Sequence, residues 1–446
     1  MKPIQDLISD IKSRNLKQEE IKATLVSCIQ VSKPDHTTKI QAQILYSLLF
    51  SEKFQEIESK KASAVLILNG FIQNPGEEKT KENILIYKDI IVGTSKDLPD
   101  KIPVDIDKIQ YIDAQNMLIS PGLIDQHIHG GYNCDFNTSD EQAILNFLLN
   151  LPKHGVTSIC PTIMTDSPEN IEIQIKKITA VKNALPLNST KIIGINLEGP
   201  FLNAEFKGAH CEKLFLEPTI ENYKRIESDE IRIITIAPEL DKNFELTKYL
   251  SDKGVIVSAG HSNADRAVFS DAVSSGLTQV THIFNAMPSL HHRQPGIIGN
   301  SLINDDIYVE IIADHNHLHQ DIIELILRIK PDSKAVFISD SLPLNHSELD
   351  STVFGGQKIF KHNEIAINET GKFAGSLMFL DSVIRKNLNL KEFSQLLMYC
   401  SFNPAKNLRL DTLGCLKKGM TADLVFWEDE IFKITSVFIN GQAVFF

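Results

Sequence analysis

The chain has 446 residues, of which 42% are hydrophobic and 23% are charged, and its formal net charge is −12 at pH 7. This composition is typical of globular proteins, and the acidic balance argues against a general binder of nucleic acid or of anionic membranes. The length predicts two or three domains, or one large barrel with additions.

Six cysteines are scattered along the chain, and no two of them form a Cys-x-x-Cys pair. This pattern indicates neither a disulfide framework nor a zinc finger, and it favours buried thiols in a reducing compartment. The N-terminus is studded with Lys, Asp and Glu, unlike a signal peptide, and no apolar run approaches the ~18 residues of a membrane span. We therefore expect a cytoplasmic protein with neither nucleic-acid nor membrane partners.

Residues 1–62 are expected to form a helical N-terminal extension. Apolar residues recur there at the i, i+3, i+4, i+7 spacing of a helix, beginning with Ile4, Leu7 and Ile8. Nothing catalytic is visible in the segment. It could be a docking or dimerisation module, or a packed appendage without activity.

Short strand-like runs flank the long middle of the chain. Residues 65–68 precede an Asn-Gly turn, and residues 422–427 and 436–439 have the same character near the other end. We expect residues 63–120 and 405–446 to come together as one small β domain, a β-sandwich, with the middle inserted between them.

Residues 121–404 alternate between strand-like and helix-like stretches. Eight strands alternating with helices over about 280 residues predict an α/β fold, a (β/α)8 TIM-like barrel, whose usual size is about 250 residues. An open doubly wound sheet is the alternative, but no Gly-x-Gly-x-x-Gly motif follows the first strand. The expected strands are 122–128, 156–162, 192–198, 232–238, 255–260, 279–283, 308–313 and 335–340, and expected helices include 141–151, 168–184 and 264–275.

The first strand of this middle segment ends in His127-Ile128-His129. Residues two apart on a strand point to the same face, so the two imidazoles project together and could form half of a metal site. A His-x-His motif alone is a weak indication, because alternating histidines can also line a half-buried strand. The motif gains weight from residues farther along the chain.

Further residues of metal-binding type stand at the ends of later strands. The carboxyl ends of the strands of such a barrel gather at the active site. One such residue alone would be a satisfied core or loop residue, but six are hard to explain as packing, since carboxylates buried together without a cation are costly. The set suits Zn²⁺, Fe²⁺ or another first-row ion. The six residues are His127, His129, Glu198, His261, His282 and Asp340.

Motifs across residues 64–446 resemble those of the N-acetylglucosamine-6-phosphate deacetylases, a family of the amidohydrolase superfamily. The most specific are Leu-Glu-Gly-Pro-Phe at 197–201, Gly-His-Ser-Asn-Ala at 260–264 and Thr-His-x-x-Asn-Ala-Met at 281–287. The first 62 residues lie outside the resemblance. Other matching pieces, all in the expected order, are 121–130, 207–210, 236–239, 293–296, 312–314 and 374–376.

The resemblance implies that Glu198, His261 and His282 bind one catalytic divalent ion. Some members of the family lack the first histidine pair and use a single metal. Because His127 and His129 are present here, the chain is similar to the members that can hold two ions, with Glu198 bridging them. The expected cofactor is therefore one or two divalent ions, Zn or Fe.

The resemblance also implies roles for residues around the metal. Asp340 would be the general acid/base, taking a proton from water and handing it to the departing amine. His210 would bind the substrate and help to polarise the acetyl carbonyl. The other expected substrate contacts are Asn285 and Ala286 with phosphate, Arg293 with phosphate across a dimer interface in some members, His317 with the sugar, and Met378 near the acetyl group.

Three departures from the family pattern concern sugar specificity more than the chemistry. His315 stands where the family usually has glycine, Phe379 stands where threonine is common, and the loop 342–345 is unusual. The expected reaction is deacetylation of N-acetyl-D-glucosamine 6-phosphate by a homodimer, giving glucosamine 6-phosphate and acetate in amino-sugar catabolism and cell-wall recycling.

Three alternatives compete with this interpretation. The first is a deacetylase of another sugar phosphate, such as N-acetylgalactosamine 6-phosphate. The second is a cyclic amidase. Many of these enzymes bridge two metals with a carboxylated lysine, whereas the third-strand position is Glu198 here, which disfavours this alternative. The third is an inactive scaffold whose binding module is the N-terminal extension, which the retention of the whole ligand set and of Asp340 disfavours.

Overall fold

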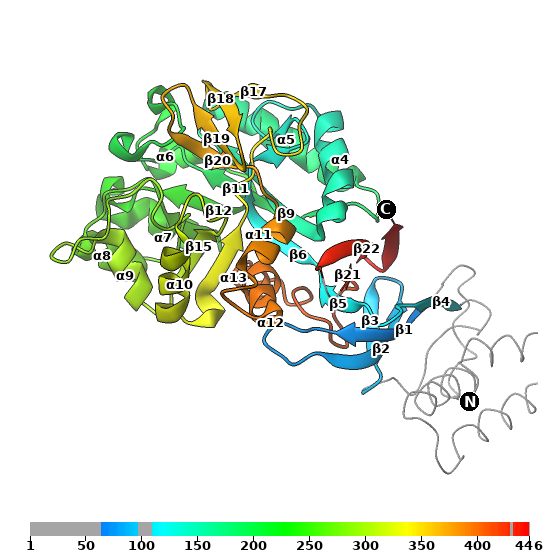
Figure 1. The fold of residues 1–446 in the computed structure, drawn as a ribbon. Helices are drawn as coiled ribbons and strands as arrows, with labels where there is room; N and C mark the ends of the chain where they lie inside the picture. Colours follow the sequence, from blue (N-terminus) through cyan, green and yellow to red (C-terminus); the bar gives the residue numbers. More distant parts are fainter. Residues whose placement is uncertain (1–63, 97–108, 429–430, 446) are drawn as a thin grey trace, which may run out of the picture.

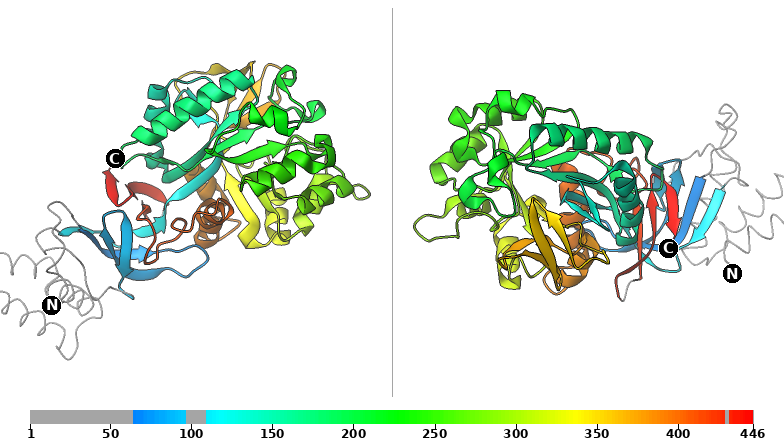
Figure 2. Two further views of the ribbon diagram at one scale, coloured as in Figure 1. Left: turned by 180° about the vertical axis from the view of Figure 1, so that it is seen from behind. Right: turned by 90° about the horizontal axis from the view of Figure 1, so that it is seen from above.

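The computed structural model describes residues 64–96, 109–428 and 431–445. It contains a large α/β unit with a smaller β unit on one side (Figures 1 and 2). The helical extension expected at residues 1–62 lies outside the described residues. Within the described ranges, no helix has the length and apolar character needed to cross a lipid bilayer.

Eight parallel strands form a nearly closed barrel at the centre of the large unit. They run in chain order around the ring, and β6 pairs with β9 at its start. Next to the gap between the last strand and β6, the Asp340 N–H donates to the His127 carbonyl at 3.0 Å. The predicted (β/α)8 fold is thereby confirmed. The strands are β6 (Leu123–Ile128), β9 (Val156–Met164), β11 (Ile195–Glu198), β12 (Ile231–Ile236), β13 (Ile256–Ala259), β14 (Leu277–Val280), β15 (Tyr308–Ile312) and β16 (Ala335–Ile338), with the short β10 (Lys191–Ile192) also paired to β9.

The barrel strands are short runs rich in β-branched residues, and side chains on both of their faces are buried. Parallel strands that are covered by helices on one face and by the barrel interior on the other are expected to be apolar along their whole length. Polar side chains cap the surrounding helices: Asp140 accepts from the Ala143 N–H at 2.8 Å and Asp265 from the Val268 N–H at 2.9 Å. These helices are α4 (Glu141–Asn150), α5 (Pro168–Ala184), α6 (Ile220–Lys224), α7 (Glu245–Asp252), α8 (Arg266–Ser274), α9 (Gly296–Ile303) and α10 (Gln320–Ile329).

Strands from both flanks of the barrel share one eight-stranded sheet in the smaller unit. Its order is β23-β22-β21-β5-β1-β2-β3, with β4 also paired to β1. The flanks meet where β5 pairs antiparallel with β21, and strands from both contribute to one apolar core. The strands are β1 (Ala64–Ile72), β2 (Thr80–Tyr87), β3 (Ile90–Thr94), β4 (Ile109–Asp113), β5 (Leu118–Pro121), β21 (Leu424–Glu428), β22 (Lys433–Ile439) and β23 (Gln442–Phe445).

A four-stranded antiparallel sheet follows the last barrel strand and was not among the predicted elements. Its strands are short, and the Gly355-Gly356 pair between the first two is a hairpin signal that could have revealed it. The sheet consists of β17 (Ser351–Phe354), β18 (Gln357–His362), β19 (Ile365–Asn368) and β20 (Phe373–Ser376). After it come α11 (Leu380–Asn387), α12 (Phe393–Leu397), a π-helical turn (Met398–Phe402) and α13 (Asn403–Asn407), while β7 (Gly130–Gly131) and β8 (Cys134–Asp135) form a small hairpin after β6.

Trp427 is the only tryptophan of the chain and connects the smaller unit to the core of the large one. It is fully buried, its indole N–H donates to the Ser120 hydroxyl at 2.8 Å, and its ring packs edge-on against Phe393. We expect Trp427→Ala to lower the thermal unfolding midpoint, because removing a large buried ring costs about 3–5 kcal/mol.

Calorimetry or circular dichroism would measure this change. The matched control is Leu187→Ala, since Leu187 is 66% exposed and surface substitutions usually stay within about 0.5 kcal/mol. Equal midpoints for the two variants would contradict the proposed role of the indole.

Candidate metal centre and active-site cavity

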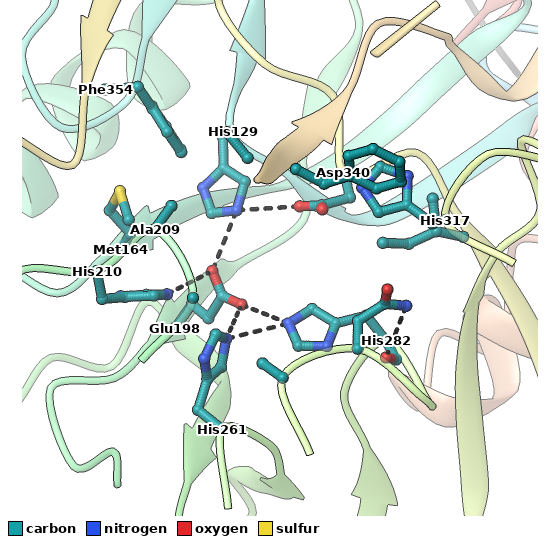
Figure 3. A pocket seen from close by; sticks show the side chains of 16 residues that line it. His129, Met164, Glu198, Ala209, His210, His261, His282, His317, Asp340 and Phe354 are labelled. Carbon is teal, nitrogen blue, oxygen red and sulfur yellow. Dashed lines mark hydrogen bonds and ion pairs between the residues drawn. The ribbon is translucent and has the colours of Figure 1, made fainter. Parts of the chain in front are cut away.

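A cavity of about 210 Å³ lies at the carboxyl ends of the barrel strands. Figure 3 shows the Glu198 carboxylate at its centre, with imidazoles approaching from several sides. Phe354 and Phe373 of the four-stranded sheet also line it. The predicted site residues on its wall are His129, Glu198, His210, His261, His282, Asn285, Ala286, His317 and Asp340.

Glu198, His261 and His282 form the first of two groups that could hold a metal ion. One oxygen of Glu198 lies 3.0 Å from His261 Nε2 and 2.8 Å from His282 Nε2, and the two nitrogens are 3.1 Å apart. Glu198 ends β11, whereas the histidines follow β13 and β14. Three donors from separate strands therefore converge on one point.

The protonation state of His261 indicates what kind of ligand the first group favours. Burial, with His210 and His282 nearby, lowers the pKa of His261 to about 4, so the ring is neutral at pH 7. Its Nδ1 lies 2.8 Å from the Phe206 carbonyl, which can only accept a hydrogen bond. The proton is therefore on Nδ1, and the Nε2 lone pair faces a carboxylate oxygen. Two acceptors at this distance favour a cation between them.

His127, His129 and Glu198 form the second group. His129 Nε2 lies 3.2 Å from the other oxygen of Glu198 and 3.2 Å from Asp340 Oδ1. His127 Nε2 is 3.7 Å and 3.6 Å from the same two carboxylates and is buried without a hydrogen-bond partner among the described residues. Glu198 thus borders both groups, one oxygen to each.

The charges of this second group favour additional positive charge. Burial acts to lower the pKa of His129, but Asp340 and Glu198 outweigh it and raise the pKa to about 9. Burial acts to raise the pKa of Glu198, yet His210 and His127 hold it well below its usual value. The carboxylates therefore stay ionised and favour positive charge beside them, either as protons on the imidazoles or as a metal ion.

Three of the candidate residues adopt left-handed backbone conformations directly after their strands. The φ angles are +49° at His261, +26° at His282 and +47° at Asp340. Residues other than glycine seldom adopt positive φ, and such strained positions cluster at functional sites. All three side chains line the cavity.

The remaining predicted residues divide into those beside this centre and those away from it. His210 Nε2 lies 3.3 Å from Glu198, and its Nδ1 lies 3.0 Å from the Thr165 hydroxyl. Arg293, by contrast, is exposed in a separate surface groove along α8 and α9. Met378 is buried in the main core and is not among the residues that line the cavity.

Two acidic residues behind the site were given no role by the sequence. Asp314 pairs with His317 at 2.7 Å. Glu310 contacts His127 Nδ1 at 3.0 Å and is fully buried in the middle of β15. The one available signal for Glu310 was an acidic residue inside an otherwise apolar strand, since acidic residues are almost never fully buried without a partner.

Comparison with known proteins agrees with this geometry. The sequence profile of the Amidohydrolase family matches residues 118–444. N-acetylglucosamine-6-phosphate deacetylases are similar in sequence: that of Bacillus subtilis is 34% identical over 323 residues, covering 70% of this chain and 81% of that protein. The human one is 32% identical over 351 residues, covering 74% and 84%.

Solved structures agree as well. The crystal structure of an N-acetylglucosamine-6-phosphate deacetylase from Pasteurella multocida has a TM-score of 0.77 at 26% identity, covering 86% of this chain and 100% of that chain. The chain belongs to the amidohydrolase family, and it is an enzyme. Its resemblance to the N-acetylglucosamine-6-phosphate deacetylases, predicted from the motifs, is confirmed by these relatives.

We expect Asp314→Asn to lower the pKa of His317. Burial acts to lower this pKa, and the ion pair with Asp314 outweighs it and raises the pKa above its ordinary value. Without the Asp314 carboxylate, burial is opposed only by the weaker effect of the Asp340 charge, so the pKa should fall. A nuclear magnetic resonance titration of the imidazole would measure the shift, with the exposed Asp321→Asn as control; a pKa that stays raised in Asp314→Asn would refute the pairing.

The same pair gives a pH dependence of stability. Because the pKa of His317 is raised in the folded protein, its contribution to the free energy of unfolding is complete below the pKa that it has in the unfolded chain. This contribution is lost as the pH rises through the pKa of the folded state. Burial acts to raise the pKa of Asp314, but His317 lowers it, so this contribution is lost as pH falls through the folded pKa. The stability difference between wild type and Asp314→Asn should therefore be largest between about pH 4 and pH 6.5.

Proposed function

We propose that the protein hydrolyses the N-acetyl group of N-acetyl-D-glucosamine 6-phosphate, releasing glucosamine 6-phosphate and acetate in amino-sugar catabolism and cell-wall recycling. Relatives at about a third identity carry the name of this activity. The observation that carries the proposal is the arrangement around Glu198: an acid/base candidate, Asp340, and a polarising candidate, His210, border the same buried donor groups.

We propose two divalent ions, Zn or Fe, of which one would be held by Glu198, His261 and His282 and the other by His127, His129 and the same Glu198. The donor types suit these ions, and the unpartnered Nε2 of His127 and the Nε2 lone pair of His261 fit a cation at each group. A cation in these groups would supply Lewis-acid activation of the amide carbonyl and of the attacking water.

Asp340 and His210 would then move and stabilise charge. The pKa of the Asp340 carboxyl, which burial acts to raise, is lowered by His129, so the group is ionised at neutral pH and has a free position for a proton from water. It would later give that proton to the departing amine. His210 would hydrogen-bond the carbonyl oxygen as negative charge develops there, while Thr165 holds its other nitrogen.

Substrate binding would use the remaining wall of the cavity. Asn285 and Ala286 would hold the phosphate, and His317, fixed by Asp314, would contact the sugar. Met378 would reach the acetyl group only if its side chain turned from the core toward the cavity.

We further propose a cytoplasmic homodimer. The five cysteines in the described part of the chain are free thiols, which supports a reducing compartment. In each subunit, residues 121–404 would form the barrel domain, and residues 63–120 and 405–446 the small β domain. Arg293 would reach the phosphate in the partner's cavity, because it is exposed and lies away from the cavity of its own chain.

The protein loaded with Zn²⁺ or Fe²⁺ should release acetate from N-acetyl-D-glucosamine 6-phosphate, and a chelator should abolish the release. Asp340→Asn should lower kcat by about 10²–10⁴-fold, because a positioned acid/base contributes roughly that factor. Acetate quantified by a coupled assay is the measurement.

Its controls separate the alternatives. N-acetylgalactosamine 6-phosphate, tested in parallel, reports on the sugar epimer, and unphosphorylated N-acetylglucosamine on the need for phosphate. A protein loaded with Zn²⁺, Fe²⁺, Co²⁺ or Mn²⁺ that releases no acetate from any of these sugars would overturn the proposed deacetylation of N-acetylated sugars.

We expect Arg293→Ala to raise KM for the phosphorylated sugar about 10–100-fold while leaving hydrolysis of the unphosphorylated sugar unchanged, since a hydrogen bond to a charged group contributes about 1.5–3 kcal/mol. Mixing Arg293→Ala with Asp340→Asn subunits tests the dimer. One hybrid site combines an intact Asp340 with the partner's intact arginine, so activity should reappear. No recovery in a demonstrated mixed dimer would assign Arg293 to its own subunit.

A further inference from the structure

Glu310 is a buried carboxylate with no direct place in the proposed chemistry. It lies in the middle of β15, inside the barrel, and none of its surface is exposed. Among the described residues its one ion pair is with His127. A carboxylate in this position is costly unless hydrogen bonds satisfy it, so its contacts should indicate its role.

Each oxygen of Glu310 has its own partners. Oε1 accepts from the side-chain amides of Gln126 at 2.7 Å and Gln279 at 2.9 Å. Both of these amides are held in turn by Asn407 of α13, which donates to their oxygens at 3.0 Å and 2.5 Å. The carboxylate is therefore fixed by a fully buried network, and its second oxygen, Oε2, is directed at His127.

This contact determines which nitrogen of His127 carries the proton and which presents a lone pair to Glu198 and Asp340. Oε2 lies 3.0 Å from His127 Nδ1, and a carboxylate can only accept a hydrogen bond. In the neutral ring the proton is therefore on Nδ1, and Nε2 presents its lone pair toward Glu198 and Asp340. Partners of this kind fix the tautomer and the orientation of metal-binding histidines and increase their basicity.

We propose that Glu310 is the positioning residue that makes His127 a metal ligand, and that it thereby determines whether a second divalent ion binds beside Glu198. The inference rests on the proposed metal centre but not on the identity of the substrate. The first group is independent of Glu310, because the Phe206 carbonyl orients His261. Loss of Glu310 should therefore affect one ion of the two.

Titration of the metal-free protein with Co²⁺ tests the proposal, followed by visible absorption and by elemental analysis after gel filtration. Wild type should bind two ions. Glu310→Ala should bind the first with unchanged affinity and the second roughly 10–100-fold more weakly, as is typical when such a supporting partner is removed. His127→Ala should lose the same ion, and the double variant should lose nothing more.

Two further variants keep the test sharp. Glu310→Gln retains an acceptor for Nδ1, but the acceptor is weaker, and its NH₂ group opposes two glutamine donors. It should lower the affinity for the second ion by a smaller factor than Glu310→Ala. It is the variant that tests the proposal if Glu310→Ala does not fold. Gln279→Leu is the matched control, because it disrupts the same buried network without removing the contact to His127. It should still bind two ions.

Several outcomes would overturn the proposal: a wild type that binds a single ion, a second-ion affinity unchanged in the Glu310 variants, or an equal loss in Gln279→Leu. Acetate release has no part in these measurements. A protein that binds two ions in a Glu310-dependent way but leaves every N-acetyl sugar phosphate intact would refute the proposed function and leave this inference standing.

Discussion

The burial of the Glu198 carboxylate is the constraint on which the arrangement of the site depends. Glu198 is only 3% exposed, and burying an ionised carboxylate is unfavourable unless positive charge or hydrogen bonds compensate. No lysine or arginine among the described residues pairs with it; its compensation comes from imidazoles on several strands. A barrel that gathers the carboxyl ends of its strands supplies these imidazoles from distant parts of the chain.

Further contacts behind the imidazoles fix their orientation. The Phe206 carbonyl holds His261, Thr165 holds His210, and Asp314 holds His317. Each of these contacts occupies one ring nitrogen and thereby determines whether the other nitrogen presents a proton or a lone pair to the cavity. The Nδ1 atoms of His129 and His282, which have no hydrogen-bond partner among the described residues, are the exceptions. The site is thus oriented mainly by backbone and side-chain hydrogen-bond partners that lie behind the imidazoles.

The sequence revealed the barrel and the residues at its strand ends, but little of this supporting layer. Periodic apolar runs locate strands, and His127 and Glu198 stand at strand ends where any barrel places its active site. The partner of His127, in contrast, is 183 residues away along the chain, and no local pattern encodes such a pairing. The left-handed backbone of His261 and Asp340 was equally invisible, because tertiary packing rather than residue type imposes it.

The departures from the family pattern look different once the fold is known. His315 replaces a glycine at a φ of +62°, and its ring is held by Asn387, whose amide also donates to the Ala313 carbonyl. Phe379 is 1% exposed and packs in the main core. Neither residue lines the cavity formed by the described part of the chain.

The unusual loop follows the same pattern. Leu342 and Leu344 of this loop pack in the core beneath the four-stranded sheet. All three departures therefore lie behind the cavity wall, where they alter packing rather than the lining of the cavity. If the substrate is the proposed sugar phosphate, residues that do line the wall would have to discriminate between sugar epimers. Of these, Phe373 lies on the four-stranded sheet, and its ring packs edge-on against His317 at 5.4 Å between centroids. The sheet that the sequence did not reveal thus supplies part of the wall of the candidate active site.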